Sequence, residues 1–174
     1  MQRVETERLV VREFVLGDEV ELFQNYHGCE QSSAFLISST HPSPEHTRGL
    51  WLRNSLAFTA DSDGLFMRVI ALKEPQVNIG CFVFIVKDQQ VEIHFGLGTA
   101  FSAVGYMTEV CSAMLVQLTA MGFKRIDTHC DTAHFASQRV MEKSGFKRVA
   151  LEREYMVVPR LGDNKRDFYF YQYP

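Results

Sequence analysis

Apolar and polar positions follow one another along this chain in patterns that predict strands and helices in a definite order. Residues 8–15 are β-branched and apolar, and predict a first strand. Residues 105–120 carry the strongest helical pattern, with apolar side chains at i, i+3 and i+4 spacing. These apolar positions are Met107, Val110, Cys111, Met114, Leu115 and Leu118. Gly122 is placed to end this helix.

Shorter patterns complete the predicted order of elements. Further helices are expected at 19–26, from Pro44 to about Ala60, and at 133–143. Further strands are expected at 65–72, 77–86, 91–96, 124–130, 146–158 and 167–173. The helix that begins at Pro44 would present Leu50, Trp51 and Phe58 to a core, and residues 28–43 before it are typical of a loop. Hairpins followed by strand–helix–strand crossovers predict an α/β (α+β) fold, with a mixed sheet and helices on both faces.

Composition and charge narrow the class of protein. The chain has 174 residues, of which 46% are hydrophobic and 22% charged, and its formal charge is −3. This is ordinary globular composition without the basic face that nucleic-acid binding needs. No apolar stretch is long enough for a signal peptide or a bilayer span, so we expect a cytoplasmic protein with no membrane partner. No linker is visible, so residues 1–174 are expected to form one domain, as a monomer or homodimer.

The cysteines indicate neither a disulfide framework nor a metal centre. They are widely separated, with no C-x-x-C spacing, at Cys29, Cys81, Cys111 and Cys130. We expect reduced thiols, mostly in the core, and no metal.

Two segments carry the candidate chemistry. The first reads Glu92-Ile93-His94-Phe95-Gly96-Leu97-Gly98 and continues as Ser102-Ala103-Val104-Gly105-Tyr106-Met107-Thr108-Glu109. The second is residues 131–146, DTAHFASQRVMEKSGF. In this order and spacing they resemble the strand–loop–helix and the following helix of GNAT acetyltransferases. The opening residues 5–12, ETERLVVR, are similar to the first strand of the branch that acetylates protein N-termini, including those of ribosomal proteins.

The resemblance implies a sheet of about seven strands that splays in the middle to admit CoA. Gly105 begins the strongest predicted helix, where free N–H groups and the positive end of the helix dipole bind phosphate. A glycine there lets a phosphate approach the backbone. Acetyl-CoA, as co-substrate, is therefore expected at Leu97, Gly98, Ser102, Ala103, Val104, Gly105, Tyr106, Met107, Thr108, His134 and Ser137.

The resemblance also implies roles in catalysis. Glu92 alternates with apolar neighbours on its predicted strand and is expected to take the proton of the amine, directly or through water. His94 on the same side of that strand, and Glu154 farther along the chain, are alternative bases. A backbone N–H near Leu97 would bind the oxyanion, and Ser137 would protonate the departing thiolate. A purely structural role is the other reading of each of these side chains.

The expected reaction is transfer of an acetyl group from acetyl-CoA to a primary amine, either a protein N-terminus or a small amine, by direct attack on the thioester. The alternative is a non-catalytic acyl-CoA-binding or interaction protein on the same fold. Two departures in the loop favour this alternative. Ser102 stands where the superfamily usually has Gln or Arg, and Met107 stands where it usually has Gly or Ala. Met141 likewise stands where many members have a tyrosine.

Overall fold

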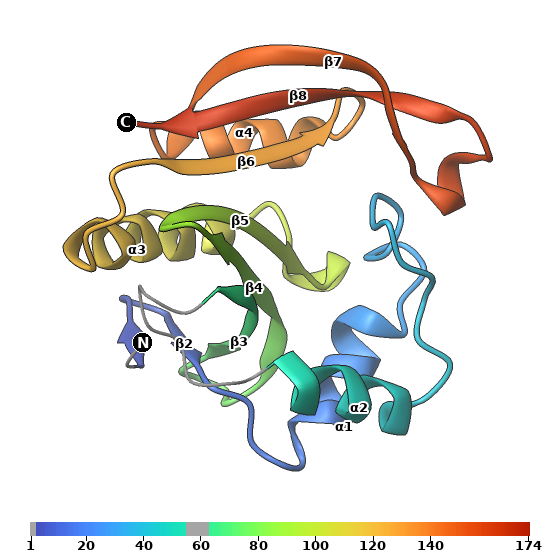
Figure 1. Cartoon of the computed structure of the whole chain (residues 1–174). Coiled ribbons are helices and arrows are strands. Elements are labelled where there is room, and N and C mark those ends of the chain that lie inside the picture. The colour runs from blue at the N-terminus through green and yellow to red at the C-terminus, as the bar shows by residue number, and fades with distance from the viewer. Residues whose placement is uncertain (1–2, 55–62) are drawn as a thin grey trace.

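The computed structural model describes residues 3–54 and 63–174, which form one eight-stranded sheet with helices on both faces (Figure 1). The strand order is β1-β2-β3-β4-β5-β6-β8-β7. The strands are β1 (Val4–Glu5), β2 (Leu9–Arg12), β3 (Gly64–Leu72), β4 (Asn78–Lys87), β5 (Gln90–Leu97), β6 (Ile126–Asp131), β7 (Lys147–Val157) and β8 (Lys165–Tyr173). The predicted mixed fold is confirmed. An eighth strand arises because Val4 and Glu5 pair with β2.

The predicted helices lie close to their expected positions, and two short 3-10 helices were not predicted. They are α1 (Asp18–Leu22), the π-helix η1 (Phe23–His27), α2 (Pro44–Asn54), η2 (Thr99–Phe101), α3 (Tyr106–Ala120), α4 (Phe135–Lys143) and η3 (Pro159–Leu161). The expected helix at 19–26 is thus α1 continued by a π-helix. The last part of the helix expected to reach Ala60, with Phe58, lies outside the described residues. None of the described helices is long and apolar enough to cross a membrane.

Two buried clusters pack the helices against the sheet. The larger cluster includes all six apolar positions predicted for α3, and each of them is at most 8% exposed. The smaller cluster lies between β3, β4 and the α1–α2 region and is centred on Trp51, which is fully buried. Cys81, Cys111 and Cys130 are buried free thiols, as expected, whereas Cys29 is half-buried.

The sheet is nearly divided between β5 and β6. These strands form the parallel pair of the sheet, and only Val91↔Ile126 and Glu92↔Asp127 are in register. Beyond this short ladder the two strands separate, with β6, β8 and β7 forming a group of their own (Figure 1). The predicted splay in the middle of the sheet is therefore present, and it opens at the C-terminal half of β5.

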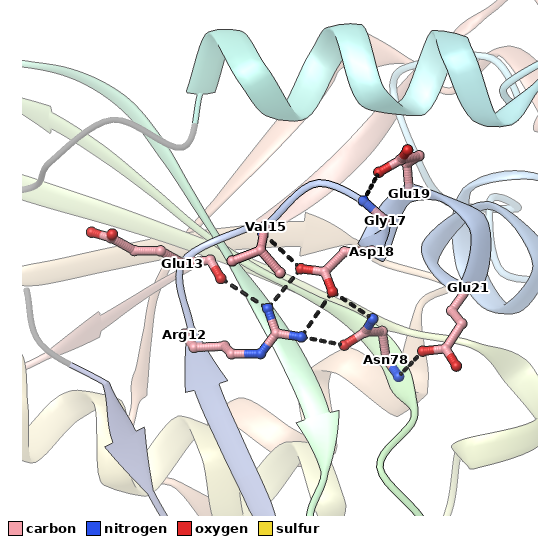
Figure 2. A network of polar contacts seen from close by, with 8 residues as sticks. All are labelled: Arg12, Glu13, Val15, Gly17, Asp18, Glu19, Glu21 and Asn78. Carbon is pink, nitrogen blue, oxygen red and sulfur yellow. Dashed lines mark hydrogen bonds and ion pairs between the residues drawn. The ribbon is translucent and has the colours of Figure 1, made fainter.

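A polar network fixes α1 to the sheet (Figure 2). Asp18 accepts two hydrogen bonds from the Arg12 guanidinium, at 2.6 and 2.9 Å, and a third from the Asn78 side chain at 3.0 Å. Glu21 accepts a hydrogen bond from Asn78 N at 2.9 Å. Since Arg12 is on β2 and Asn78 on β4, the network sets the place of α1, and so of η1, over the sheet.

Candidate active site

The loop before α3 presents unpaired backbone N–H groups. Gly105 precedes the helix with φ 89°, and Ala103 has φ 65°. The first hydrogen bond of this turn runs from Glu109 N to Gly105 O at 3.1 Å, which leaves the preceding N–H groups without helical acceptors. Alternating left-handed residues of this kind form concave anion sites. A Cβ added at Gly105 would meet only the Arg8 guanidinium, at 3.5 Å, so the approach to the backbone is open.

Arg8 lies beside this loop, a neighbour that the sequence did not reveal. Its Nη1 donates to Val104 O at 3.2 Å, and Nη2 lies 2.7 Å from Glu109 Oε2. The guanidinium also lies over the ring of Tyr106, 4.6 Å from the centroid. The cation that Ser102 does not supply is therefore present at the loop, although it is paired with Glu109.

The other side chains of the loop and first turn have different surroundings. Ser102 Oγ donates to Gly98 O at 3.4 Å, and Val104 is exposed. Met107 belongs to the buried core, so at this position only the backbone can reach a ligand. Thr108 is half-buried in the first turn of α3.

At the end of β5, the chain itself approaches the backbone closely. A Cβ on Gly96 would lie 1.9 Å from the Tyr26 hydroxyl, and one on Gly98 would lie 2.1 Å from Asn25 O. Both neighbours belong to η1, so packing of the π-helix accounts for these two glycines. Gly98 N donates to Ile79 O at 2.8 Å, on β4. In an antiparallel ladder the next residue points the other way, so the N–H of Leu97 faces the splay.

Glu92, His94 and His129 meet where β5 and β6 separate. His94 Nε2 lies 2.6 Å from Glu92 Oε1, and His129 Nδ1 lies 3.4 Å from the same oxygen. The hydrogen bond with His94, outweighing burial, lowers the pKa of Glu92 below its usual range. Burial lowers the pKa of His129 to about 4, and the nearby His94 adds to the effect. At neutral pH the cluster therefore holds a carboxylate beside a neutral His129 imidazole.

Aromatic side chains surround His129. Its ring stacks on Phe170 at 5.0 Å and makes edge contacts with Phe168 and Tyr155. Tyr155 comes from β7, two strands away from β6 in the sheet. It reaches His129 from a segment where β7 and β8 lose their register, between Glu152 and Met156. Irregularities of this kind re-aim side chains near active sites.

The remaining candidates occupy α4 and β7. His134 precedes α4 and stacks on Phe35 of the 28–43 loop, with ring centroids 4.2 Å apart. Ser137 faces Cys130, so it lies on the opposite side of β6 from His129. Ser137 and Glu92 could therefore contact the same bound thioester only where the sheet is open, within the splay. Glu154 is exposed at the β7 irregularity, with φ 48°.

Comparison with known proteins identifies the family. Residues 8–147 match the family model described as "Acetyltransferase (GNAT) domain". No curated protein sequence was found to match the chain.

Solved structures share the fold. A GNAT-family acetyltransferase from Bacillus anthracis superposes with a TM-score of 0.83 at 23% identity, covering 98% of this chain and 96% of the other. RimL, a ribosomal L7/L12 alpha-N-protein acetyltransferase in complex with CoA, gives 0.81 at 18% identity, covering 98% and 96%. Spermidine N-acetyltransferase from Vibrio cholerae, in complex with CoA and spermine, gives 0.76 at 12% identity, covering 94% of each chain. With the family model matching most of its length, the chain belongs to the GNAT family of acetyltransferases.

Proposed function

We propose that this chain transfers the acetyl group of acetyl-CoA to a primary amine, within a single domain spanning residues 1–174. The observation that carries the proposal is the arrangement around the β5–β6 splay. Open backbone N–H groups before α3 lie on one side of it, and the ionised Glu92 lies where the strands part. A phosphate-bearing co-substrate and an amine thus have separate, adjacent places.

Acetyl-CoA binding is assigned to the 102–108 loop and the first turn of α3. The pyrophosphate would accept hydrogen bonds from the N–H groups around Gly105, helped by the positive end of the α3 dipole. Arg8 adds a guanidinium whose charge Glu109 partly offsets. The thioester would lie along β5, where the Leu97 N–H can donate to the oxygen as it becomes an oxyanion. His134 and Ser137 would contact the co-substrate from α4.

In the proposed step the amine nitrogen attacks the thioester carbon, the C–S bond breaks, and one amine proton leaves. Glu92 is ionised at neutral pH and ready to accept that proton, but its lowered pKa makes it a weak base toward an ammonium group, whose pKa is about 8 for a protein N-terminus and about 10 for an alkyl amine. An ammonium group has no lone pair, so it must lose one proton, to solvent or through water or His94 to Glu92, before the neutral amine attacks. The second N–H proton leaves once the N–C bond has formed. Ser137 donates a hydrogen bond to the departing sulfur.

The acceptor is proposed to be a protein N-terminus, with small amines as the second class. The support is the likeness of residues 5–12 to the branch that acetylates protein N-termini. Solved structures of both kinds share the fold, one acting on a ribosomal protein and one bound to spermine. Assays with a peptide panel and with polyamines would decide between the classes.

The test of co-substrate binding is Gly105→Glu, which adds bulk and negative charge where the pyrophosphate would lie. The matched control is Gly122→Glu, just beyond the C-terminal end of α3, where an added Cβ meets nothing within 4 Å. CoA affinity measured by calorimetry should fall at least about tenfold for the first variant and stay unchanged for the second. Equal CoA affinity in a folded Gly105→Glu protein would contradict the assignment.

Thermal denaturation with acetyl-CoA separates an enzyme from a binding protein. A ligand of the native state stabilises it by about 2.7 kcal/mol at one hundred times its Kd. Stabilisation without transfer to any amine would leave a non-catalytic acyl-CoA-binding protein.

For Ser137→Ala, single-turnover rates should fall about tenfold, below the usual range for a general acid, because a thiolate also leaves unaided.

A further inference from the structure

The Glu92–His94–His129 cluster has the composition and shape of a metal site. One ligand atom from each residue lies within 4.8 Å of the other two. Glu92 and His94 are two apart on β5 and point to the same side. Continued by two residues, the register Glu92↔Asp127 places His94 across from His129, just inside the splay. Spacing along the chain did not indicate a metal site here, because His129 comes from another strand.

We propose that these three side chains bind a divalent transition-metal ion of the Zn²⁺ type, and that the bound ion stops acetyl transfer. The inhibition rests on the proposed function, because it follows from the role given to Glu92. The binding site does not depend on that role. It goes beyond the sequence expectation, in which no metal was implied.

One of the ligand–ligand separations already suits a tetrahedral ion, and His94 must move to bring its own into range. Ligand atoms 2.0–2.2 Å from a tetrahedral zinc lie about 3.3–3.6 Å from one another. His129 Nδ1 and Glu92 Oε1 already lie 3.4 Å apart. The His94–Glu92 contact, at 2.6 Å, is a hydrogen bond that the ion would replace, so His94 must move by about an ångström. Three protein ligands leave a fourth position for water.

His129 supplies an independent sign of a missing partner. Its Nδ1 is buried and has no hydrogen-bond partner among the described residues, although it faces Glu92. The side chain is only 11% exposed. A buried nitrogen without a partner costs about 1–3 kcal/mol, so structures rarely leave one unsatisfied. A metal ion between Nδ1 and Glu92 would accept this lone pair.

The aromatic side chains around His129 hold the ligand in place. Stacking on Phe170 and edge contacts with Phe168 and Tyr155 fix the plane of the imidazole. Such support is what a metal ligand needs, because loosely held imidazoles lose affinity.

The donor set selects the class of ion. Two imidazoles and one carboxylate suit Zn²⁺, Co²⁺ and Ni²⁺, whereas Mg²⁺ and Ca²⁺ prefer oxygen ligands throughout. An ion bound to Glu92 and His94 would occupy the proposed base and its alternative together. The amine would then have no proton acceptor, and transfer would stop until a chelator removed the ion.

The test begins with binding alone, in chelator-treated full-length protein without CoA, since the CoA thiol itself binds zinc. Zn²⁺ is titrated by calorimetry, and Co²⁺ by the absorption bands of a tetrahedral complex. The key variant is His129→Phe, which keeps an aromatic ring in an aromatic setting but removes both nitrogens. His94→Gln is the second variant. His46→Gln, an exposed histidine of α2 outside the cluster, is the matched control.

We expect one ion per chain, affinity at least about tenfold weaker in both cluster variants, and no change in the control. Absence of one-to-one binding, or equal binding by folded His129→Phe, would overturn the site. Acetyl transfer is then measured in the metal-free protein with and without Zn²⁺. Binding with no transfer under any condition would contradict the proposed function and leave the metal site standing. Transfer that Zn²⁺ leaves unchanged would overturn the inhibition.

Discussion

Among single residues, Glu92 bears the proposed proton transfer most directly. Replacing it with glutamine keeps the shape but removes the base, so turnover should fall about 10²–10⁴-fold while CoA affinity stays close to that of the wild type. The matched control is Glu152→Gln, since Glu152 is an exposed carboxylate of β7 with no proposed role. Steady-state rates across the pH range check both variants. Wild-type turnover in Glu92→Gln would assign it a structural role and move attention to His94 or Glu154.

Ala103 has a backbone conformation that favours glycine. Its φ of 65° costs an L-residue about 1–2 kcal/mol in the native state. Glycine avoids that cost and lowers stability by only about 0.4–1 kcal/mol, because it gives the unfolded chain more conformational entropy. Ala103→Gly should therefore leave the free energy of unfolding unchanged or raise it by up to about 1 kcal/mol. The control is Ala113→Gly inside α3, where the free energy of unfolding should fall by about 1 kcal/mol. Urea denaturation measures both, and a loss at position 103 as large as that at 113 would contradict the strain.

At this scale the sequence predicted part of the candidate site. The alternation of Glu92 and His94 with apolar neighbours on β5 was visible in the pattern, and the structure places both on one side of that strand. Arg8 and His129 were missed because each reaches the site through tertiary contacts between segments distant in sequence, Arg8 beside the start of α3 and His129 on β6. Nothing in a single chain pattern states which strands become neighbours.

Among the elements, η1 packs closely against the end of β5. A methyl group on Gly96 would collide with the Tyr26 hydroxyl, so Gly96→Ala should lower the free energy of unfolding by about 1–3 kcal/mol. Gly49→Ala is the control, because Gly49 is in α2 and an added Cβ has its nearest neighbour at 3.5 Å. That change should stabilise by about 0.5–1 kcal/mol, as alanine favours a helix. Thermal unfolding of both variants checks the pair, and equal effects would be inconsistent with close packing.

Element type was predictable where one periodic pattern ran long enough. The α3 pattern holds over four turns, and the hairpin strands β3 to β5 are apolar runs bounded by turn residues, so both were located within about two residues. The π-helix at 23–27 and the lost register in β7 had no such signal. Both arise from tertiary packing, one against Gly96 and Gly98 and the other around Tyr155, and local propensity does not encode it.

For the whole molecule, buried histidines make stability depend on pH. Burial, with the charges of nearby histidines, lowers the pKa of His27 to about 3 and that of His41 to about 4, from 6.5. The rings stack 4.4 Å apart, and Trp51 Nε1 donates to His27 Nε2. Between pH 6.5 and 4 the unfolded chain binds more protons than the native state, so stability is full above 6.5 and falls on acidification.

The loss should amount to about 2 kcal/mol or more between pH 6.5 and 4.5, measured by urea denaturation at each pH. In His41→Asn the slope should be smaller, because one depressed group is gone. In His46→Gln the slope should be slightly smaller too, because His46 contributes to the lowered pKa of both buried rings. A pH-independent stability over this window would contradict the burial of these rings in neutral form.

The two-residue ladder between β5 and β6 should also affect hydrogen exchange of the backbone amides with solvent. The amides of Phe95 and Leu97 point away from β4 into the splay, beyond the last β6 partner, whereas Gly98 donates to Ile79. Deuterium should therefore enter at alternate residues of one strand, quickly at 95 and 97 and slowly at 98, in the middle of an eight-stranded sheet. A ligand that accepts hydrogen bonds from this strand would slow the fast positions alone. Deuterium exchange at individual amides would then report ligand binding in the splay, without an acceptor amine and without the transfer reaction.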